Sequence, residues 1–216
     1  MDKAVLAKSR VIEMLNKLVS RENTDRSLPV AVSAPTGLAA FNVGGSTIHR
    51  LLSLPIEHGK PADYSRLHQE QLVLLKATFK RLKLLILDEV SMVSSLVLLF
   101  IHRWLTEIMS CNDLFGGISV LFFADLLQLP PVKGNQPFIP DTFLEAKQRF
   151  GAVGTVDLWK SFEYVELTIN MRQNGDKTYA DLLSSVRVGS LTDNQHSILS
   201  ERLIAPGRRA RVARVW

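Results

Sequence analysis

The sequence predicts an α/β domain in which helices cover a mostly parallel β-sheet. Strand-like and helix-like segments alternate along the chain, a pattern typical of parallel sheets. Two short apolar runs, Leu84–Leu87 and Ile118–Phe123, have the character of strands that are buried on both faces. The first run ends at Asp88 and Glu89, and the second is followed by Asp125. Because open α/β sheets bind ligands at the carboxyl ends of their strands, these acids mark the expected site.

The elements before the first acidic strand are predicted from apolar spacing and from residues that begin or end helices. Apolar residues recur at helical spacing in the first helix. Thr36 opens the second helix, and Gly44 and Gly45 end it. In order, we predict a helix over Lys3–Ser20, a strand over Pro29–Ser33, and helices over Thr36–Phe41, Thr47–Leu54 and Arg66–Lys80.

The later elements are predicted from cap residues and turn residues. Ser94 or Ser95 can cap a helix that runs through Leu96–Met109. Gly189 can end a helix over Asp176–Val188. The remaining predicted elements are a turn at Leu114–Gly117, a strand over Tyr164–Leu167 and a helix over Thr192–Arg202.

The composition indicates a soluble globular protein and excludes several classes. The 216 residues are 46% hydrophobic and 22% charged, which excludes a mainly disordered chain. The single cysteine, Cys111, excludes a disulfide framework and a cysteine-based zinc site. No apolar run approaches the roughly 20 residues of a membrane span, so we expect an intracellular protein with no membrane partner. The net charge of +5 is compatible with a polyanion, and the arginine-rich tail, 204–216, is expected to be disordered.

The segment Ser33–His49, SAPTGLAAFNVGGSTIH, has two interpretations. Its small residues and glycines leave the backbone accessible, and Thr36, Ser46, Thr47 and His49 carry polar groups without bulk. This chemistry suits contacts to a nucleic-acid backbone, which main-chain N–H groups and hydroxyls commonly hold. A Gly-rich turn with a helix cap at Thr36 accounts for the same residues. The chemistry of the segment leaves both interpretations open.

Four segments occur in a particular order along the chain: APTGLAAFNVGGSTIH, LLILDEVSM, FGGISVLFFADLLQLPPV and ELTINMRQ. Together they resemble the Pif1-like branch of superfamily 1 DNA helicases, which includes the helicases of Helitron-type transposons. The resemblance runs from about Lys8 to about Arg202 and implies a RecA-like P-loop NTPase motor domain over residues 1–203. It also implies ATP-driven 5′-to-3′ movement on single-stranded DNA and unwinding of duplex DNA, with roles in DNA repair, recombination and telomere maintenance.

The resemblance also implies roles for individual residues. Asp88 resembles the acid that holds Mg²⁺, and Glu89 the base that activates the hydrolytic water. Gln128 is similar to the glutamine that senses the γ-phosphate of ATP, and Arg172 to the arginine that stabilises the transferring phosphoryl group. Contacts to the DNA strand are implied for Thr36, Gly37, Thr47 and His49. The structural alternatives are a solvated acid pair, a surface salt bridge at Arg172 and a packed or capping His49.

The nucleotide-binding loop departs from the family pattern. No GxxxxGK[ST] motif occurs, but Lys8 and Ser9 align with the phosphate lysine and the Mg²⁺-binding hydroxyl of that loop. In this degenerate segment, residues 2–9, Asp2 and Ala7 occupy glycine positions. Glycine is needed there because the backbone N–H groups must wrap around the phosphates. Ordinary helix surface is the alternative interpretation of Lys8 and Ser9.

We expect the motor domain to be truncated at both ends. No strand precedes the degenerate loop, Ala124 replaces a family glycine, and no second RecA-like domain follows, although ATP binds between two such domains in the family. We therefore expect weak or no unwinding by this chain alone. Two alternatives stay open: a non-catalytic, transposon-derived remnant that at most binds DNA, and a P-loop NTPase of another kind. A eukaryotic protein of this type is expected in the nucleus or the mitochondrion.

Overall fold

The computed structural model describes residues 13, 29–54, 67–132, 134–140, 157–167 and 176–201. The chain forms two compact units, Met1–Leu167 and Thr168–Trp216, and each is described by itself. The first unit contains a parallel sheet with its helices, and the second contains a pair of helices. The assignment of residues 1–203 to one motor domain stays a prediction.

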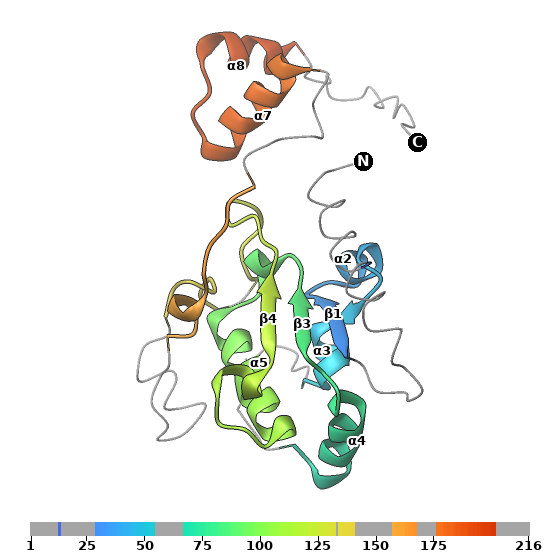
Figure 1. Cartoon of the computed structure of the whole chain (residues 1–216). Helices are drawn as coiled ribbons and strands as arrows, with labels where there is room; N and C mark the ends of the chain where they lie inside the picture. Colours follow the sequence, from blue (N-terminus) through green and yellow to red (C-terminus); the bar gives the residue numbers. More distant parts are fainter. Residues whose placement is uncertain are drawn as a thin grey trace. The chain divides into compact units, whose positions relative to one another are not determined.

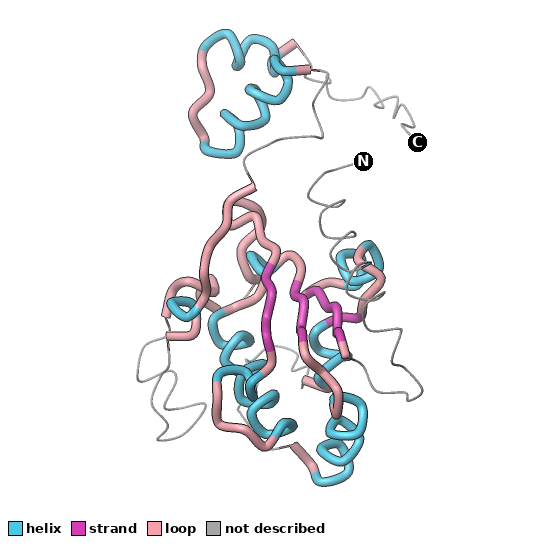
Figure 2. Tube along the Cα trace, viewed as in Figure 1, coloured by secondary structure: helices cyan, strands magenta, loops and turns pink. Residues whose placement is uncertain are grey.

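A four-stranded parallel sheet forms the centre of the first unit (Figure 1). Its strands lie in the order β2-β1-β3-β4, and Figure 2 shows β1, β3 and β4 side by side in magenta. The third strand pairs with both neighbours along its whole length, from Leu84 to Leu87. The α/β class and the parallel sheet are thereby confirmed. The strand bounds are Val30–Ala34 for β1, Ser46–Thr47 for β2, Leu84–Leu87 for β3 and Ser119–Phe122 for β4.

Helices connect the strands within the segments that the sequence predicts to be helical. The predicted cap of the longest helix is confirmed, because the Ser94 hydroxyl accepts a hydrogen bond from the Val97 N–H at 3.2 Å. The helices are α2 (Gly37–Asn42), α3 (Ile48–Leu52), α4 (Gln69–Phe79) and α5 (Ser95–Met109). Three short 3-10 helices are η1 (Val90–Met92), η2 (Leu114–Gly117) and η3 (Trp159–Ser161).

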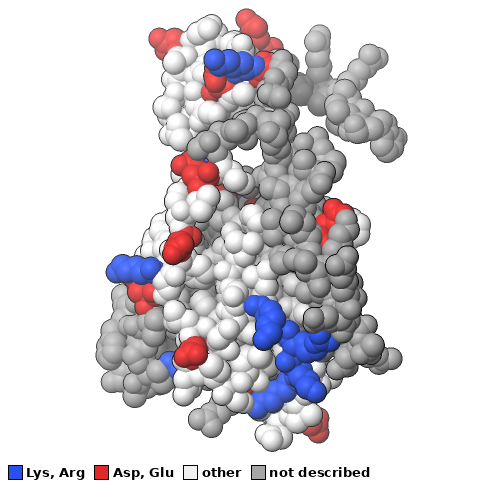
Figure 3. All heavy atoms as spheres, viewed as in Figure 1, with Lys and Arg blue, Asp and Glu red and all other residues white. Residues whose placement is uncertain are grey.

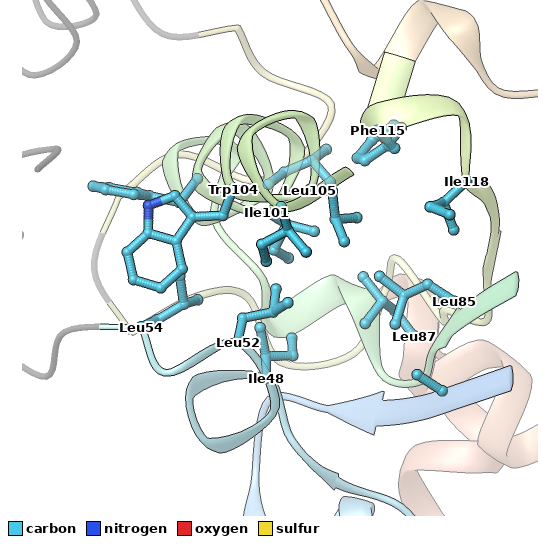
Figure 4. Close-up of a cluster of buried hydrophobic side chains, with 14 of the residues drawn as sticks. Ile48, Leu52, Leu54, Leu85, Leu87, Ile101, Trp104, Leu105, Phe115 and Ile118 are labelled. Carbon is cyan, nitrogen blue, oxygen red and sulfur yellow. The ribbon is translucent and has the colours of Figure 1, made fainter. Parts of the chain in front are cut away.

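The core lies between the sheet and the helices α3 and α5. Leu85 and Leu87 alternate along β3 and point to the same face, as the two-residue period of a strand requires. Figure 4 shows them opposite Ile101 and Leu105 of α5, with Ile48 and other α3 residues beside them. Each of these five side chains is at most 1% exposed. Burial of this cluster fixes the strand ends in position, and the candidate site is built on those ends.

The second unit is a pair of helices, α7 (Lys177–Val188) and α8 (Asp193–Ser200). The predicted end of α7 is confirmed, because Gly189 adopts the left-handed conformation there with φ 71°. Thr192 and Gln195 form a reciprocal capping box at the start of α8. The amide of Gln195 also donates to the Ser185 hydroxyl of α7 at 3.0 Å, which ties the two helices together.

Two predicted elements have different outcomes. The predicted strand over Tyr164–Leu167 is wrong, because these residues form an exposed segment without a strand ladder. The predicted helix over Lys3–Ser20 lies outside the described residues, apart from position 13. Within the part of the chain that the structure covers, the helices are too short or too polar to cross a bilayer.

Candidate functional site

The carboxyl ends of β1, β3 and β4 lie at one edge of the sheet because the strands are parallel (Figure 1). Thr36 follows β1, Asp88 and Glu89 follow β3, and Asp125 follows β4. The sheet order places β3 between the other two strands. The structure therefore brings the acid pair to the middle of the edge, with the predicted DNA contacts on the β1 side and Gln128 on the β4 side.

Asp88 is held firmly at the end of β3. Its backbone N–H donates to the carbonyl of Ser33 on β1 at 2.9 Å, which continues the ladder one residue beyond the strand. The side chain is only 5% exposed. A buried carboxylate needs compensating hydrogen bonds or a cation, so burial at this position suits a metal ligand better than a solvated surface acid.

Glu89 has a backbone conformation that residues other than glycine rarely adopt. Its φ is 52° and its ψ is 44°, in the left-handed region. The N–H of the next residue, Val90, donates to the carbonyl of Phe123 beyond β4 at 3.1 Å, which fixes this turn. Such conformations cost about 1–2 kcal/mol and concentrate at functional positions. The Glu89 carboxylate is half-exposed, whereas the Asp88 carboxylate is buried.

The chemistry of the acid pair fits a nucleotide-bound Mg²⁺ better than a protein-only metal site. Among the described residues, no three His, Cys, Asp or Glu side chains gather closely enough to hold a metal by themselves. Mg²⁺ prefers oxygen ligands and is commonly held by one or two carboxylates together with substrate phosphates and water. Asp88 supplies a carboxylate of this kind, so the residues present fit that mode of binding.

Gln128 and Asp125 form a pair at the end of β4. The Gln128 amide nitrogen Nε2 donates to Asp125 Oδ2 at 3.0 Å, and the Gln128 N–H donates to the Asp125 carbonyl at 2.9 Å. Asp125 Oδ1 also accepts from the Leu127 N–H at 3.2 Å. These bonds close a tight turn in which the exposed amide of Gln128 is oriented by the carboxylate.

Ala124, which precedes this turn, is exposed and is not among the described residues with positive φ. Its backbone conformation therefore does not require glycine. The methyl group creates no backbone strain at this position, although the resemblance places glycine there.

Thr36 and Gly37 begin the helix α2 directly after β1. The Thr36 hydroxyl accepts from the Ala39 N–H at 3.2 Å, so the predicted cap is confirmed. A hydroxyl that accepts one bond still carries a proton that it can donate. A Cβ placed on Gly37 would meet nothing within 4 Å, so packing does not require glycine there. The absence of a side chain leaves the backbone open to close approach from outside.

Thr47 and His49 lie beside this segment because β2 pairs with β1 in parallel, with Thr47 opposite Ala34. The Thr47 hydroxyl caps α3 by accepting from the Arg50 N–H at 3.3 Å. His49 is half-buried, and burial lowers the pKa of its imidazole below the usual 6.5. At neutral pH the ring is therefore uncharged and can offer a hydrogen bond, but no ionic attraction, to a phosphate.

Phe41 is a candidate residue that the sequence pattern did not single out. It lies on α2, one helical turn after Gly37, and is 82% exposed; the neighbouring Leu38 is 73% exposed. An exposed aromatic ring beside hydroxyl groups is the arrangement that single-strand binding proteins use to stack a base. No sequence signal indicated this role, because the exposure of Phe41 on α2 is known only from the folded structure.

Three predicted site residues, Lys8, Ser9 and Arg172, lie outside the described residues. The structure thus assembles Asp88, Glu89 and Gln128 with the predicted DNA contacts at one edge. The roles assigned to all of these residues stay predictions.

Comparisons with known proteins agree with this arrangement. Residues 7–197 match the family described as PIF1-like helicase. The ATP-dependent DNA helicase PIF1 of Saccharomyces cerevisiae is 33% identical over 190 residues, which cover 85% of this chain and 20% of that protein.

Two solved structures share the fold. One, which describes DNA unwinding at forked double-stranded DNA by two coordinating Pif1 helicases, is 32% identical with a TM-score of 0.61, covering 86% of this chain and 43% of that chain. The other, Pif1 helicase from Bacteroides in complex with ADP-AlF3 and single-stranded DNA, is 29% identical with a TM-score of 0.61, covering 88% and 43%. The chain therefore spans less than half the length of these relatives.

Proposed function

Because this chain belongs to the PIF1-like helicase family, we propose that it forms part of a DNA motor that couples ATP hydrolysis to 5′-to-3′ movement and duplex unwinding. The observation that supports this most directly is the shared sheet edge, where buried Asp88 and half-exposed Glu89 follow β3 and the hydroxyl-rich segment follows β1. By family, such motors serve DNA repair, recombination and telomere maintenance.

The acid pair divides the chemistry of hydrolysis between two carboxylates. Asp88 would hold Mg²⁺, and the bound ion would supply charge neutralisation on the phosphates. Glu89 accepts a proton from water as the water oxygen bonds to the γ-phosphorus and the bond to the ADP oxygen breaks. The different environments of the two side chains support this division of roles, because Asp88 is buried and Glu89 is half-exposed.

Gln128 contacts the γ-phosphate from the β4 side. Because Asp125 already fixes the orientation of the amide, Gln128 loses little side-chain entropy when its N–H group contacts the phosphate. Lys8 and Ser9 contribute the phosphate and Mg²⁺ contacts of the nucleotide loop, and Arg172 stabilises charge on the transferring phosphoryl group. ATP lies between this domain and the second RecA-like domain of the complete helicase.

Single-stranded DNA lies on the β1–β2 side of the same edge. Thr36 and Thr47 donate hydroxyl protons to phosphate oxygens, and Gly37 lets the strand approach the backbone closely. The neutral imidazole of His49 adds a further hydrogen bond. Phe41 stacks on a base, an interaction that does not depend on sequence.

The hydrolysis assignment is tested by DNA-stimulated ATP turnover of the full chain with the Glu89→Gln variant. This substitution keeps the shape of the side chain and removes the base. A general base typically contributes about 100-fold or more to the rate, so we expect a loss of at least that size. Mg²⁺-dependent binding of a fluorescent ATP analogue should persist in Glu89→Gln and weaken in Asp88→Asn.

A matched control is Glu70→Gln, which changes an acid in the first turn of α4, away from the acid pair. Its turnover should equal that of the parent chain. Robust turnover that Glu89→Gln leaves unchanged would show that another residue acts as the base.

The DNA assignment is tested by fluorescence anisotropy with a short single-stranded oligonucleotide. Thr47→Val removes a hydroxyl, and a hydrogen bond to a charged group is worth about 1.5–3 kcal/mol, so affinity should fall about 10-fold or more. Thr192→Val is the matched control, because it removes another helix-capping hydroxyl in α8. Equal affinities of the two variants would contradict the assignment. Phe41→Ala should weaken binding to the normal strand but not to an abasic strand.

A further inference from the structure

Four basic side chains gather where α4 ends and β3 begins, and the strand-edge site uses none of them. Figure 3 shows blue atoms that meet in one continuous area low on this face, where Figure 1 places α4. Three of the side chains are lysines exposed to solvent, and the arginine is half-buried. No acidic residue occurs between Glu70 and Asp88 in the sequence. The α4–β3 basic patch consists of Lys76, Lys80, Arg81 and Lys83.

The patch stands on a rigid base. Phe79 and Leu82 alternate with the basic residues and are 0% and 2% exposed, so the core anchors the backbone between the charges. Lys83 is fixed on both sides, because its N–H donates to the Pro29 carbonyl at 2.9 Å and its carbonyl accepts from the Ser119 N–H at 3.2 Å. A ligand that binds here therefore has little backbone to order, which reduces the entropic cost of binding.

The helix-end effect accounts for only part of this concentration of positive charge. Lys76 and Lys80 lie at the C-terminal end of α4, where cations are favoured by about 0.3–1 kcal/mol. Lys83 lies beyond the helix and gains nothing from that effect. The Lys76 ammonium donates to the Ser110 hydroxyl at 2.8 Å, which is a neutral partner. Neighbouring like charges repel one another, so their proximity is more useful for binding a polyanion than for stability.

We propose that the α4–β3 basic patch binds the phosphate backbone of DNA at a second point, at the opposite edge of the sheet from the strand-edge site. Lys83 precedes β3 and Asp88 follows it, so the two points are about 16 Å apart along the strand direction at 3.3 Å per residue. The contact is electrostatic and does not read sequence. This inference rests on DNA as the partner in the proposed function, and it adds a contact which that function does not require.

The phosphates at this second point belong either to the continuing single strand or to duplex DNA. Fluorescence anisotropy of the full chain can separate the sources with three probes: a single strand of about 6 nucleotides, one of about 25 nucleotides, and a forked duplex, each titrated at several salt concentrations. If the phosphates belong to the single strand, altering the patch should lower affinity for the long strand. If they belong to duplex DNA, altering the patch should lower affinity for the forked duplex alone.

The variant to compare is the double charge reversal Lys80→Glu with Lys83→Glu. We expect affinity for the short strand to stay within about 2-fold, and affinity for the long strand or the fork to fall about 10-fold or more. The slope of log affinity against log salt should become shallower by about 1.4 for a single strand or about 1.8 for duplex DNA, because two phosphate contacts are lost. The neutral pair Lys80→Gln with Lys83→Gln should give a smaller loss in the same direction. Thermal melting confirms that each variant is folded.

The matched control is Lys160→Glu with Lys177→Glu, which reverses two exposed lysines elsewhere on the molecule. An equal loss of affinity in this control would mean that net charge alone is responsible and would overturn the proposal. Unchanged binding of all three probes by the patch variant would also overturn the proposal. An acidic protein would then be the partner to test. Failure of the proposed DNA site has a different signature, because the parent chain would then not bind the short strand.

Discussion

Glu89 lies in the turn between β3 and η1 in a conformation that disfavours any residue with a Cβ atom. Replacing it with glycine removes this steric cost, whereas alanine keeps it. We therefore expect Glu89→Gly to be more stable than Glu89→Ala by about 1 kcal/mol, measured as the free energy of unfolding in urea. At an ordinary helical position the order would be reversed, so equal or reversed stabilities would show that the turn relaxes. Both variants should lose ATP turnover.

His102 predicts a pH dependence of stability. It is 7% exposed, and its Nδ1 accepts from the Phe115 N–H at 3.0 Å, which only an unprotonated nitrogen can do. Burial, followed by the nearby charge of Arg103, lowers the pKa of His102 below 6.5. The unfolded chain therefore binds the proton more readily than the folded chain. The stability that this difference confers is complete above the unfolded pKa and is lost as the pH falls below it.

The measurement is the free energy of urea unfolding between about pH 5 and pH 8, in the parent chain and in His102→Gln. Glutamine can accept the Phe115 hydrogen bond but does not titrate. The variant should therefore show a flatter decline at acid pH. An unchanged decline would assign the pH dependence to other groups, among them His49, whose pKa is also lowered.

The sequence predicted the site residues that depend on strand ends, but not the geometry around them. Asp88 and Glu89 could be placed because an apolar run ends there. The left-handed backbone of Glu89 could not be predicted, because it depends on the bond from Val90 to the carbonyl beyond β4. The pairing of Gln128 with Asp125 likewise needs a turn whose closure only the folded structure shows.

At the scale of elements, substitutions of two glycines in Ser33–His49, the proposed DNA-binding segment, have opposite expected effects. A Cβ on Gly45 would lie 2.3 Å from the Val32 carbonyl oxygen on β1, whereas a Cβ on Gly37 would lie in open space. Gly45→Ala should therefore destabilise the protein by about 1–3 kcal/mol through overpacking. Gly37→Ala should preserve stability and reduce affinity for single-stranded DNA.

Thermal melting together with DNA binding by anisotropy checks this pair of variants. The informative result is a separation of effects, with melting affected in Gly45→Ala and binding of a folded protein affected in Gly37→Ala. Normal DNA affinity of Gly37→Ala would remove Gly37 from the list of contacts. A normal melting temperature of Gly45→Ala would mean that β1 can shift to admit the methyl group.

The segment Tyr164–Leu167 shows why an exposed strand is harder to predict from sequence than a strand that is buried on both faces. Its aromatic, β-branched and aliphatic residues, Tyr164, Val165 and Leu167, favour an extended backbone, but a strand also needs a partner. Within the described residues no strand pairs with it, and Tyr164 and Val165 are 77% and 83% exposed. In contrast, β3 was predictable because a strand that is buried on both faces has a continuous apolar run, which is visible in the sequence.

At the scale of the whole molecule, one core supports the entire sheet edge. Leu105 is 0% exposed and belongs to the cluster that joins β3, α3 and α5. Leu105→Ala should lower the free energy of unfolding by about 2–5 kcal/mol, a large part of the stability of a typical domain. Because the acid pair and the proposed DNA-binding segment share this support, the proposed ATP binding and DNA binding should decline together on heating.

This coupling can be measured by following ATP-analogue binding and DNA binding against temperature in Leu105→Ala. The two curves should coincide and should shift downward together relative to the parent chain. Leu74→Ala is a suitable control, because Leu74 is an apolar residue of α4 that is 67% exposed. Curves that separate by many degrees would indicate that the two sides of the edge unfold independently.

The unequal attachment of the strands has a mechanical consequence. The acid pair follows β3, which is bonded over four residues to strands on both sides. The proposed DNA-binding segment, Ser33–His49, includes β2, which has only two residues. A short ladder joins β2 to β1, and the buried Ser33 hydroxyl donates to the Ser46 carbonyl at 2.8 Å. The proposed DNA-contacting side of the edge is therefore held by fewer hydrogen bonds than the side that carries the acid pair. In a motor that converts ATP hydrolysis into movement, such a difference allows the β1–β2 side to adjust its position while the acid pair keeps its alignment.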